Sequence, residues 1–90
     1  MELDPKIKAS LIDICTRSGK YVKEVQKEVF LCRTKNYEIV LDFNNLKLDL
    51  QNITQKTAET IDMKNIKDVK WIASDVVKIK TDKGEIIIEL

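Results

Sequence analysis

Residues 37–53 read YEIVLDFNNLKLDLQNI, with apolar side chains at every second position on both sides of Asn44-Asn45. Alternation with a period of two is typical of a β-strand that buries one face. A two-residue turn at the asparagines, which tolerate the positive φ angles that such a turn requires, would fold the stretch into a hairpin. The stretch therefore predicts two antiparallel strands and a mostly β fold.

The turn also predicts the register of this hairpin. The expected pairs are Phe43–Leu46, Leu41–Leu48 and Ile39–Leu50 on one face and Asp42–Lys47 on the other. A slip of one residue would turn every apolar side chain to the wrong face, so the register is strongly specified. Upstream, a turn at Lys35-Asn36 predicts the pairs Cys32–Ile39, Phe30–Leu41 and Arg33–Glu38. Residues 28–53 are therefore predicted to form a three-stranded meander.

The end of the chain repeats the pattern. The segments VKWIA, VVKIKTD and EIIIEL are separated by Ser74-Asp75 and Lys83-Gly84. Because Gly84 allows the positive φ of a tight turn, a two-residue loop is expected there. That loop predicts the pairs Thr81–Ile86, Ile79–Ile88, Val77–Leu90 and Lys78–Glu89, and it leaves Asp82 opposite Glu85 at the hairpin base. Residues 69–90 are predicted to form a second three-stranded meander.

The first part of the chain predicts a helix over residues 5–17. Asp4 caps a helix start, Pro5 fits its first position, and Gly19 suits the left-handed conformation after its end. One helical stripe is apolar and consists of Ile7, Leu11, Ile14 and Cys15. Part of the segment also alternates like a strand, but the two end signals favour a helix. Residues 20–27 fit either a helix or a strand, and their valines favour a strand.

These elements predict a single α+β domain over residues 1–90, with mostly antiparallel β-structure. The N-terminal helix packs on six or seven strands in two three-stranded meanders, which form a small sandwich or a partly open barrel. The connector over residues 54–67 is expected to hold no more than a short helix or turn. A chain of 90 residues builds one core and no cleft between domains.

The composition gives little support for catalysis. The chain has no His, the commonest general base and a common metal ligand, and only two Gly, too few for a glycine-rich phosphate loop. Cys15 and Cys32 lack metal-ligand spacing and are expected to be buried, reduced thiols, with a disulfide between them as the less favoured alternative. We therefore expect no catalytic residue, no cofactor and no metal ion.

Charge and hydropathy predict a cytoplasmic protein. Charged residues make up 34% of the chain, and no apolar run is long enough to span a bilayer. The first ten residues, MELDPKIKAS, are charged and lack the apolar stretch of a signal peptide. We expect no membrane association.

Two surfaces are candidates for binding. The terminal segment EIIIEL either closes a barrel or leaves an edge that pairs with a partner or a second copy. This candidate edge consists of Ile86, Ile87, Ile88 and Leu90. A basic stripe with an aromatic residue can hold phosphates and stack a base. This candidate nucleic-acid face consists of Lys70, Trp71, Lys78 and Lys80.

The expected function is that of a small, non-enzymatic intracellular binding module that acts through protein–protein association, by sheet-edge pairing or homodimerisation. The alternative is a nucleic-acid-binding small β-domain that uses the Lys/Trp face. A third reading is a viral or plasmid accessory protein that inhibits a host enzyme, although no residue argues for it.

Overall fold

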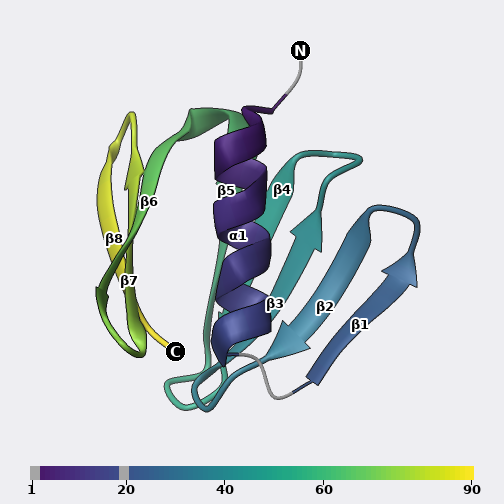
Figure 1. Ribbon diagram of the computed structural model, residues 1–90. Coiled ribbons are helices and arrows are strands. Elements are labelled where there is room, and N and C mark those ends of the chain that lie inside the picture. Colours follow the sequence, from purple (N-terminus) through teal and green to yellow (C-terminus); the bar gives the residue numbers. More distant parts are fainter. Residues whose placement is uncertain (1–2, 19–20) are drawn as a thin grey trace.

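The computed structural model describes residues 3–18 and 21–90. This part of the chain forms one N-terminal helix and eight antiparallel strands (Figure 1). The elements are α1 Pro5–Ser18, β1 Tyr21–Gln26, β2 Val29–Arg33, β3 Tyr37–Asp42, β4 Lys47–Asn52, β5 Thr57–Asp62, the 3₁₀ helix η1 Met63–Asn65, β6 Ile66–Ala73, β7 Val76–Thr81 and β8 Gly84–Glu89. The predicted α+β class, with one helix on mostly antiparallel β-structure, is confirmed.

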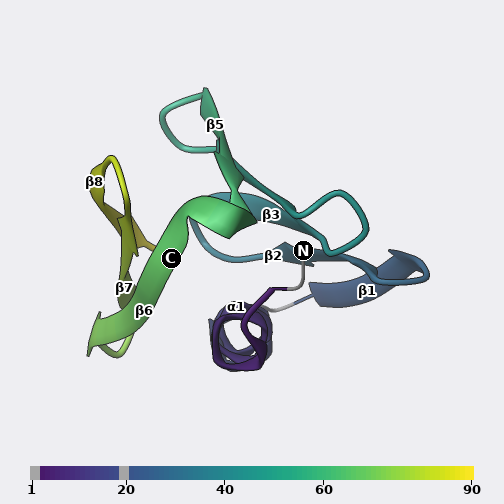
Figure 2. The same cartoon turned by 90° about the horizontal axis from the view of Figure 1, so that it is seen from above.

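The strands form two sheets, each a meander. The first has the order β1-β2-β3-β4-β5 and the second β6-β7-β8, with η1 at the corner between them. Seen from above, α1 lies on one side, next to β6 and the first strands, while β5 and β8 lie on the other (Figure 2). The arrangement is a partly open barrel in which α1 fills the gap between β6 and the first sheet. The described strands do not close the second gap, between β5 and β8.

The helix begins as its sequence predicts. The backbone N–H of Lys6 donates to the Asp4 carboxylate at 2.8 Å, and Pro5 is the first helical residue. The apolar stripe is buried and consists of Ile7, Leu11, Ile14 and Cys15. The predicted stop signal, Gly19, lies outside the described residues. The segment over residues 20–27, which fits both a helix and a strand by sequence, contains β1, so the preference for a strand is confirmed.

The registers predicted for β2–β3 and β3–β4 are confirmed. The structure pairs Cys32–Ile39, Phe30–Leu41, Arg33–Glu38, Leu41–Leu48, Ile39–Leu50 and Asp42–Lys47. The turn between β3 and β4 differs from the predicted two-residue turn, because the positive φ lies at Leu46 rather than at the asparagines. Asp42 accepts bonds from the backbone N–H groups of Asn44 and Asn45, both at 3.0 Å, and so organises a four-residue loop. The predicted Phe43–Leu46 pair therefore lies in the loop and outside the ladder.

The predicted connector over residues 54–67 is wrong, because it contains β5. This strand pairs with β4, from Asn52 opposite Thr57 to Lys47 opposite Asp62. Only Ile61 among its residues is buried, so the apolar alternation that revealed the other strands is missing here. The described residues therefore form eight strands instead of six or seven, and the first meander has five strands instead of three.

The second meander has the predicted strands, but its last register is shifted. The pairs are Thr81–Gly84, Ile79–Ile86 and Val77–Ile88, with the turn at Asp82-Lys83. A shift by two residues keeps every side chain on its predicted face. It also moves Asp82 out of the ladder, which removes the like-charge pair with Glu85 that the predicted register contained.

The core lies between α1 and the inner faces of both sheets. It consists of Ile7, Leu11, Ile14, Cys15, Cys32, Ile39, Leu41, Leu48, Leu50, Ile61, Met63, Ile66, Val77, Ile79, Ile88 and Leu90.

Cys15 and Cys32 form a disulfide between α1 and β2, so the prediction of reduced thiols is wrong. The folding of α1 onto β2 brings their Cα atoms within 5.7 Å, a proximity that sequence spacing does not reveal.

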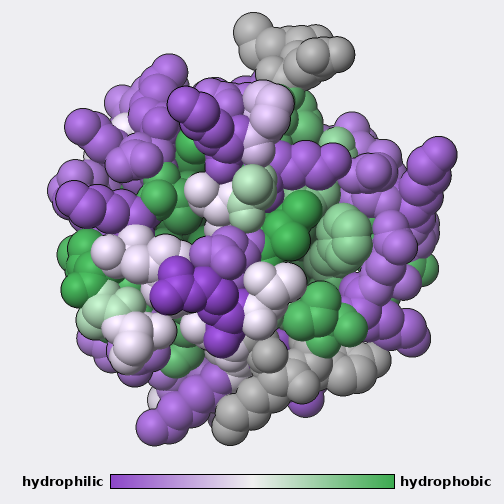
Figure 3. All heavy atoms as spheres, viewed as in Figure 1, coloured by the Kyte–Doolittle hydropathy of each residue, from purple (hydrophilic) through white to green (hydrophobic). Residues whose placement is uncertain are grey.

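The outer surface is largely polar. On the face shown in Figure 1, hydrophilic residues predominate, and hydrophobic residues are visible between them (Figure 3). The exposed large apolar side chains belong to Val22, Val25, Ile53, Ile72 and Ile87. Across the described part of the chain, α1 is too short and too polar to cross a bilayer, and no other helix qualifies.

Candidate binding groove

The strands β5 and β8 are the facing edges of the two sheets. Within the described residues, β5 pairs only with β4, and β8 pairs only with β7. Of the two outcomes expected for the terminal strand, closure of a barrel or an open edge, the structure has the open edge. Each edge presents backbone groups that lack a neighbouring strand.

The hydrogen-bond ladder between β5 and β4 determines which backbone groups of β5 point outward. The N–H of Met63 donates to the carbonyl of Leu46 at 2.8 Å. Because bonded and non-bonded positions alternate along an antiparallel strand, Thr57, Glu59 and Ile61 bond to β4. The N–H and C=O groups of the intervening residues, Ala58, Thr60 and Asp62, therefore point toward β8 or solvent.

The same reasoning applies to β8. The N–H of Leu90 donates to the carbonyl of Asp75 at 2.8 Å, so Ile86 and Ile88 bond to β7. The backbone groups that point outward belong to Glu85, Ile87 and Glu89. One of them has a partner, since the side-chain amide of Asn36 donates to the carbonyl of Glu89 at 3.2 Å. The edge between Glu85 and Ile87 is open.

Three hollows follow each other along β8, with volumes of about 200, 180 and 350 Å³. The first two lie between β8 and β5, and the third lies between β8 and the loops that precede β3 and β5. Neighbouring hollows share lining residues: Glu59 and Ile86 join the first two, and Tyr37 and Asn52 join the last two. They therefore make one continuous depression, which we call the edge groove. It runs from the corner at Asn65 and Asp82 to the loop residues Asn36 and Gln55. The C-terminal end of β5 lies near the start of β8, so the two strands run antiparallel.

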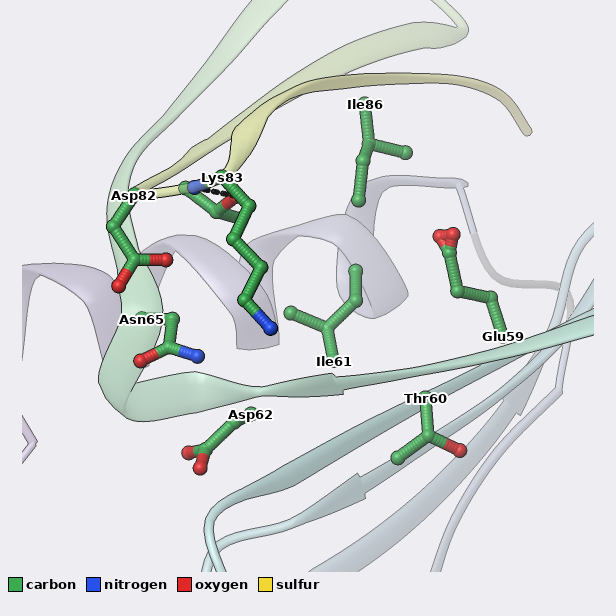
Figure 4. Close-up of a pocket in the computed structure, with 9 residues that line it drawn as sticks. Glu59, Thr60, Ile61, Asp62, Asn65, Asp82, Lys83 and Ile86 are labelled. Atoms are coloured by element: carbon green, nitrogen blue, oxygen red, sulfur yellow. Dashed lines mark hydrogen bonds between the residues drawn. The ribbon is translucent and has the colours of Figure 1, made fainter.

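The floor of the edge groove is apolar. Ile61 and Glu59 project from β5 toward the side where Ile86 of β8 lies, whereas Thr60 and Asp62 project from the opposite face of β5 (Figure 4). Ile61 is buried and Ile86 is half-buried. Leu50, a core residue on β4, lines the middle hollow.

The rim of the edge groove is acidic. Among the described residues, the carboxylates of Glu59, Asp82 and Glu89 have no hydrogen-bonding or ion-pair partner. Lys83 is the basic residue of the lining. The chain as a whole carries a net charge of +1, so this negative charge is a local property of the groove.

Asp62, at the end of β5, is already neutralised in part. Its carboxylate lies 3.5 Å from the Lys47 ammonium and 4.0 Å from that of Lys64. The backbone N–H of Lys64 donates to it at 3.0 Å, and this bond, helped by the two lysines, lowers the pKa of Asp62 below its ordinary value of 3.8. Asp62 is therefore ionised at neutral pH.

The predicted partner-binding edge divides between core and surface. Ile88 and Leu90 are buried in the core, so their side chains do not face a partner. Ile86 lines the edge groove, and Ile87 projects from the other face of β8 with a relative exposure of 59% for the whole residue. Of these four residues, Ile86 and Ile87 are the ones accessible at the edge.

The predicted nucleic-acid face is not assembled on one surface. Lys70, Lys78 and Lys80 project from the outer face of the second sheet, where Lys78 lies 3.4 Å from Glu85. Trp71 belongs to the inner face of β6. Its indole N–H donates to Asp13 of α1 at 3.3 Å, and the Arg17 guanidinium lies 4.2 Å from its ring centre. The aromatic ring and the lysines thus have different neighbours.

Sequence reasoning missed the β5 side of the groove because it missed β5. A signal was present, since Asp42, Asn52 and Asp62 are equally spaced along the chain. Each begins a loop with a side-chain oxygen that accepts backbone bonds: Asp42 from the N–H groups of Asn44 and Asn45, Asn52 from those of Thr54 and Gln55, and Asp62 from that of Lys64. An Asp or Asn that repeats at this spacing indicates where one strand ends and a loop to the next strand begins.

The edge groove offers unpaired strand backbone, an apolar floor and negative charge. In residues 3–18 and 21–90, no group of three or more His, Cys, Asp and Glu side chains is placed to hold a metal ion.

Comparisons of the chain with protein-family models, curated proteins and solved structures give no match.

Proposed function

We propose that the protein is a small, non-enzymatic binding module that associates with other protein chains through its sheet edges. The observation that carries the proposal is the open edge of β8, where the outward backbone groups of Glu85 and Ile87 lack a neighbouring strand and Ile87 is largely exposed. An unpaired edge is a template for an added strand, which contributes main-chain hydrogen bonds.

The regularity of β5 and β8 supports this assignment. Proteins commonly protect edge strands with bulges, which interrupt pairing. The other two edges have such bulges: β1 between Glu24 and Gln26, and β6 between Ile66 and Asp68 and again between Trp71 and Ala73. The described pairs of β4–β5 and β7–β8 are regular throughout. The two facing edges are therefore the ones suited to receive a strand.

The proposal includes self-association, because a second copy also carries open edges.

The nucleic-acid alternative has less support. Lys80 lies between Asp68 and Glu85 in the strand register, and Trp71 lies on the other face of the sheet. Lysines interleaved with carboxylates form a weak phosphate-binding surface.

The compartment is a separate part of the proposal. The sequence predicts a cytoplasmic protein, whereas disulfides persist mainly in oxidising compartments and are rare in the cytosol of mesophiles. Alkylation of free thiols in cells of the native source, followed by mass spectrometry, distinguishes the two. Alkylated Cys15 and Cys32 support the cytosol, and bridged cysteines support an oxidising compartment.

A displayed library of random peptides tests the binding function directly. The library is selected on the wild-type protein and counter-selected on Ile87→Pro, which removes an outward N–H and leaves the β7 ladder in place. Peptides that bind the wild type and lose affinity for Ile87→Pro support the proposal. Light scattering is measured in parallel, and a dimer that Ile87→Pro dissociates supports its self-association form. No enriched peptide, together with a monomer at every concentration, would overturn it.

A further inference from the structure

We propose that the edge groove accepts an extended peptide in which apolar residues alternate with lysine or arginine, and that this peptide pairs as an added strand with β5 and β8. The inference rests on the proposed function and specifies the chemistry of the partner. Three features support this peptide: the shape of the gap between β5 and β8, the two faces of a strand placed in that gap, and the charge at the rim of the edge groove.

The gap between β5 and β8 is the unfilled counterpart of the one that α1 occupies. Helix α1 contacts β6 and β3 and thereby closes one side of the partial barrel. On the other side, the regular edges of β5 and β8 line one continuous groove. Because these two strands run antiparallel, an inserted strand is antiparallel to one and parallel to the other. Each edge strand has six residues, so the groove matches roughly 20 Å of extended chain.

A strand in this position presents alternate side chains to two different environments. Its inward side chains meet the apolar floor of Leu50, Ile61 and Ile86. Its outward side chains pass beside the ends of Glu85 and Glu89, which project from the outer face of β8. An alternation of apolar and charged residues therefore fits both sides of the added strand.

The carboxylates at the rim of the groove determine which charge the peptide should carry. Glu59, Asp82 and Glu89 have no side-chain partner among the described residues, whereas the nearby Lys83 is a single basic group. Lysine or arginine on the outward face of the peptide would neutralise Glu89 and Asp82, and acidic residues there would be repelled. A second copy of this chain is the poorer occupant, since its own β8 brings Glu85 and Glu89 into the acidic groove.

Three synthetic peptides of about eight residues test the inference against the ¹⁵N-labelled protein. The first alternates valine with lysine, the second alternates valine with glutamate, and the third has the composition of the first with its valines and lysines in two blocks. We expect the first peptide to bind at least tenfold more tightly than the other two. Its binding should shift the amide signals of Ala58, Thr60, Asp62, Glu85 and Ile87 and slow their hydrogen exchange.

Charge reversal at the rim provides a matched pair of variants. Glu89→Lys should weaken binding of the valine–lysine peptide by roughly tenfold, because Glu89 projects from the outer face of β8 beside the peptide's lysines and the reversal replaces an attraction with a repulsion. Glu24→Lys, the same change on the distant β1 edge, should alter affinity less than about twofold. Asp82→Lys repeats the test at a turn position if Glu89→Lys does not fold.

Several outcomes would overturn the inference. Equal binding of the valine–glutamate peptide removes the charge argument, and amide shifts confined to β1 place the site elsewhere. Self-association that protects the same five amides in the absence of peptide replaces the peptide with a second copy. If the three peptides fail while the displayed library yields binders sensitive to Ile87→Pro, the inference fails and the proposed function stands. If the library also fails and the protein is monomeric, both fail.

Discussion

Cys15 of α1 and Cys32 of β2 are joined by a disulfide that links the helix to the five-stranded sheet across a sequence separation of 17 residues. Both residues are buried, with exposures of 1% and 0%. The bond holds α1 on the side of the partial barrel opposite the edge groove. It therefore helps to fix which of the two gaps the helix fills.

Reduction of this disulfide is expected to lower the free energy of unfolding by about 3 kcal/mol, because the bridge restricts a loop of this length in the unfolded chain. Urea unfolding with and without a reductant measures the difference. The double variant Cys15→Ser, Cys32→Ser is the control and should show no response to reductant. Equal stability of the oxidised and reduced wild-type protein would contradict the bond's structural role.

The alternation of outward and bonded amides along β5 predicts unequal effects of proline on stability at two adjacent, exposed positions. Ala58→Pro removes an N–H that points away from β4 and should change the free energy of unfolding by less than about 0.5 kcal/mol. Glu59→Pro removes an N–H that bonds to β4 and should cost about 1–3 kcal/mol. Thermal or urea unfolding of the two variants measures the contrast, and equal losses would show that the register of β5 is wrong.

The loop of Asp42 predicts a loss of stability in acid. Bonds from the Asn45 side chain and from the backbone N–H groups of Asn45 and Asn44 lower the pKa of Asp42 below its ordinary value of 3.8. A depressed folded-state pKa stabilises the protein above the unfolded-state pKa, and this contribution disappears as the pH falls through the folded-state value. We expect the free energy of unfolding to decline below about pH 4.

A natural control for this effect exists in the next loop, where Asn52 makes the same type of bonds without titrating. Asp42→Asn should therefore fold and should reduce the acid dependence measured by urea unfolding between about pH 2 and 6. An unchanged pH profile in Asp42→Asn would assign the acid sensitivity to other carboxylates and contradict this account of the loop.

The single Trp of the chain reports on the contact between α1 and the second sheet. Arg17→Ala removes the cation over the Trp71 ring and the ion pair with Asp13, 3.5 Å away. It should reduce stability by about 0.5–1 kcal/mol and change the Trp fluorescence spectrum. Arg33→Ala, which breaks the exposed pair with Glu38, is the control and should leave the spectrum unchanged. Identical spectra for both variants would contradict the placement of Arg17.

The sequence predicted those parts of the fold in which apolar alternation is strong. Leu41, Leu48, Ile39 and Leu50 determine the register of β3–β4 because each must face the core, and the structure has that register. In β8, every residue from 85 to 88 is compatible with a strand, so the pattern gave the faces and left the turn uncertain by two residues.

The groove was less predictable because its features depend on tertiary structure. β5 buries only Ile61, because Glu59 on the same face lines the groove instead of a core and Thr60 and Asp62 project from the outer face (Figure 4). Glu59 looks like any surface carboxylate in the sequence, and its position becomes informative only when β8 is placed across from it. The pairing of Cys15 with Cys32 likewise depends on how α1 packs onto β2.

Hydrogen exchange of the free protein, resolved residue by residue, shows whether the edges of β5 and β8 are open. We expect exchange rates to alternate along both edges: fast exchange at Ala58, Thr60, Glu85 and Ile87, and slow exchange at the bonded residues Glu59, Ile61, Ile86 and Ile88. Uniform slow exchange along β5 and β8 in the monomer would show that these strands are already paired and would contradict the open groove.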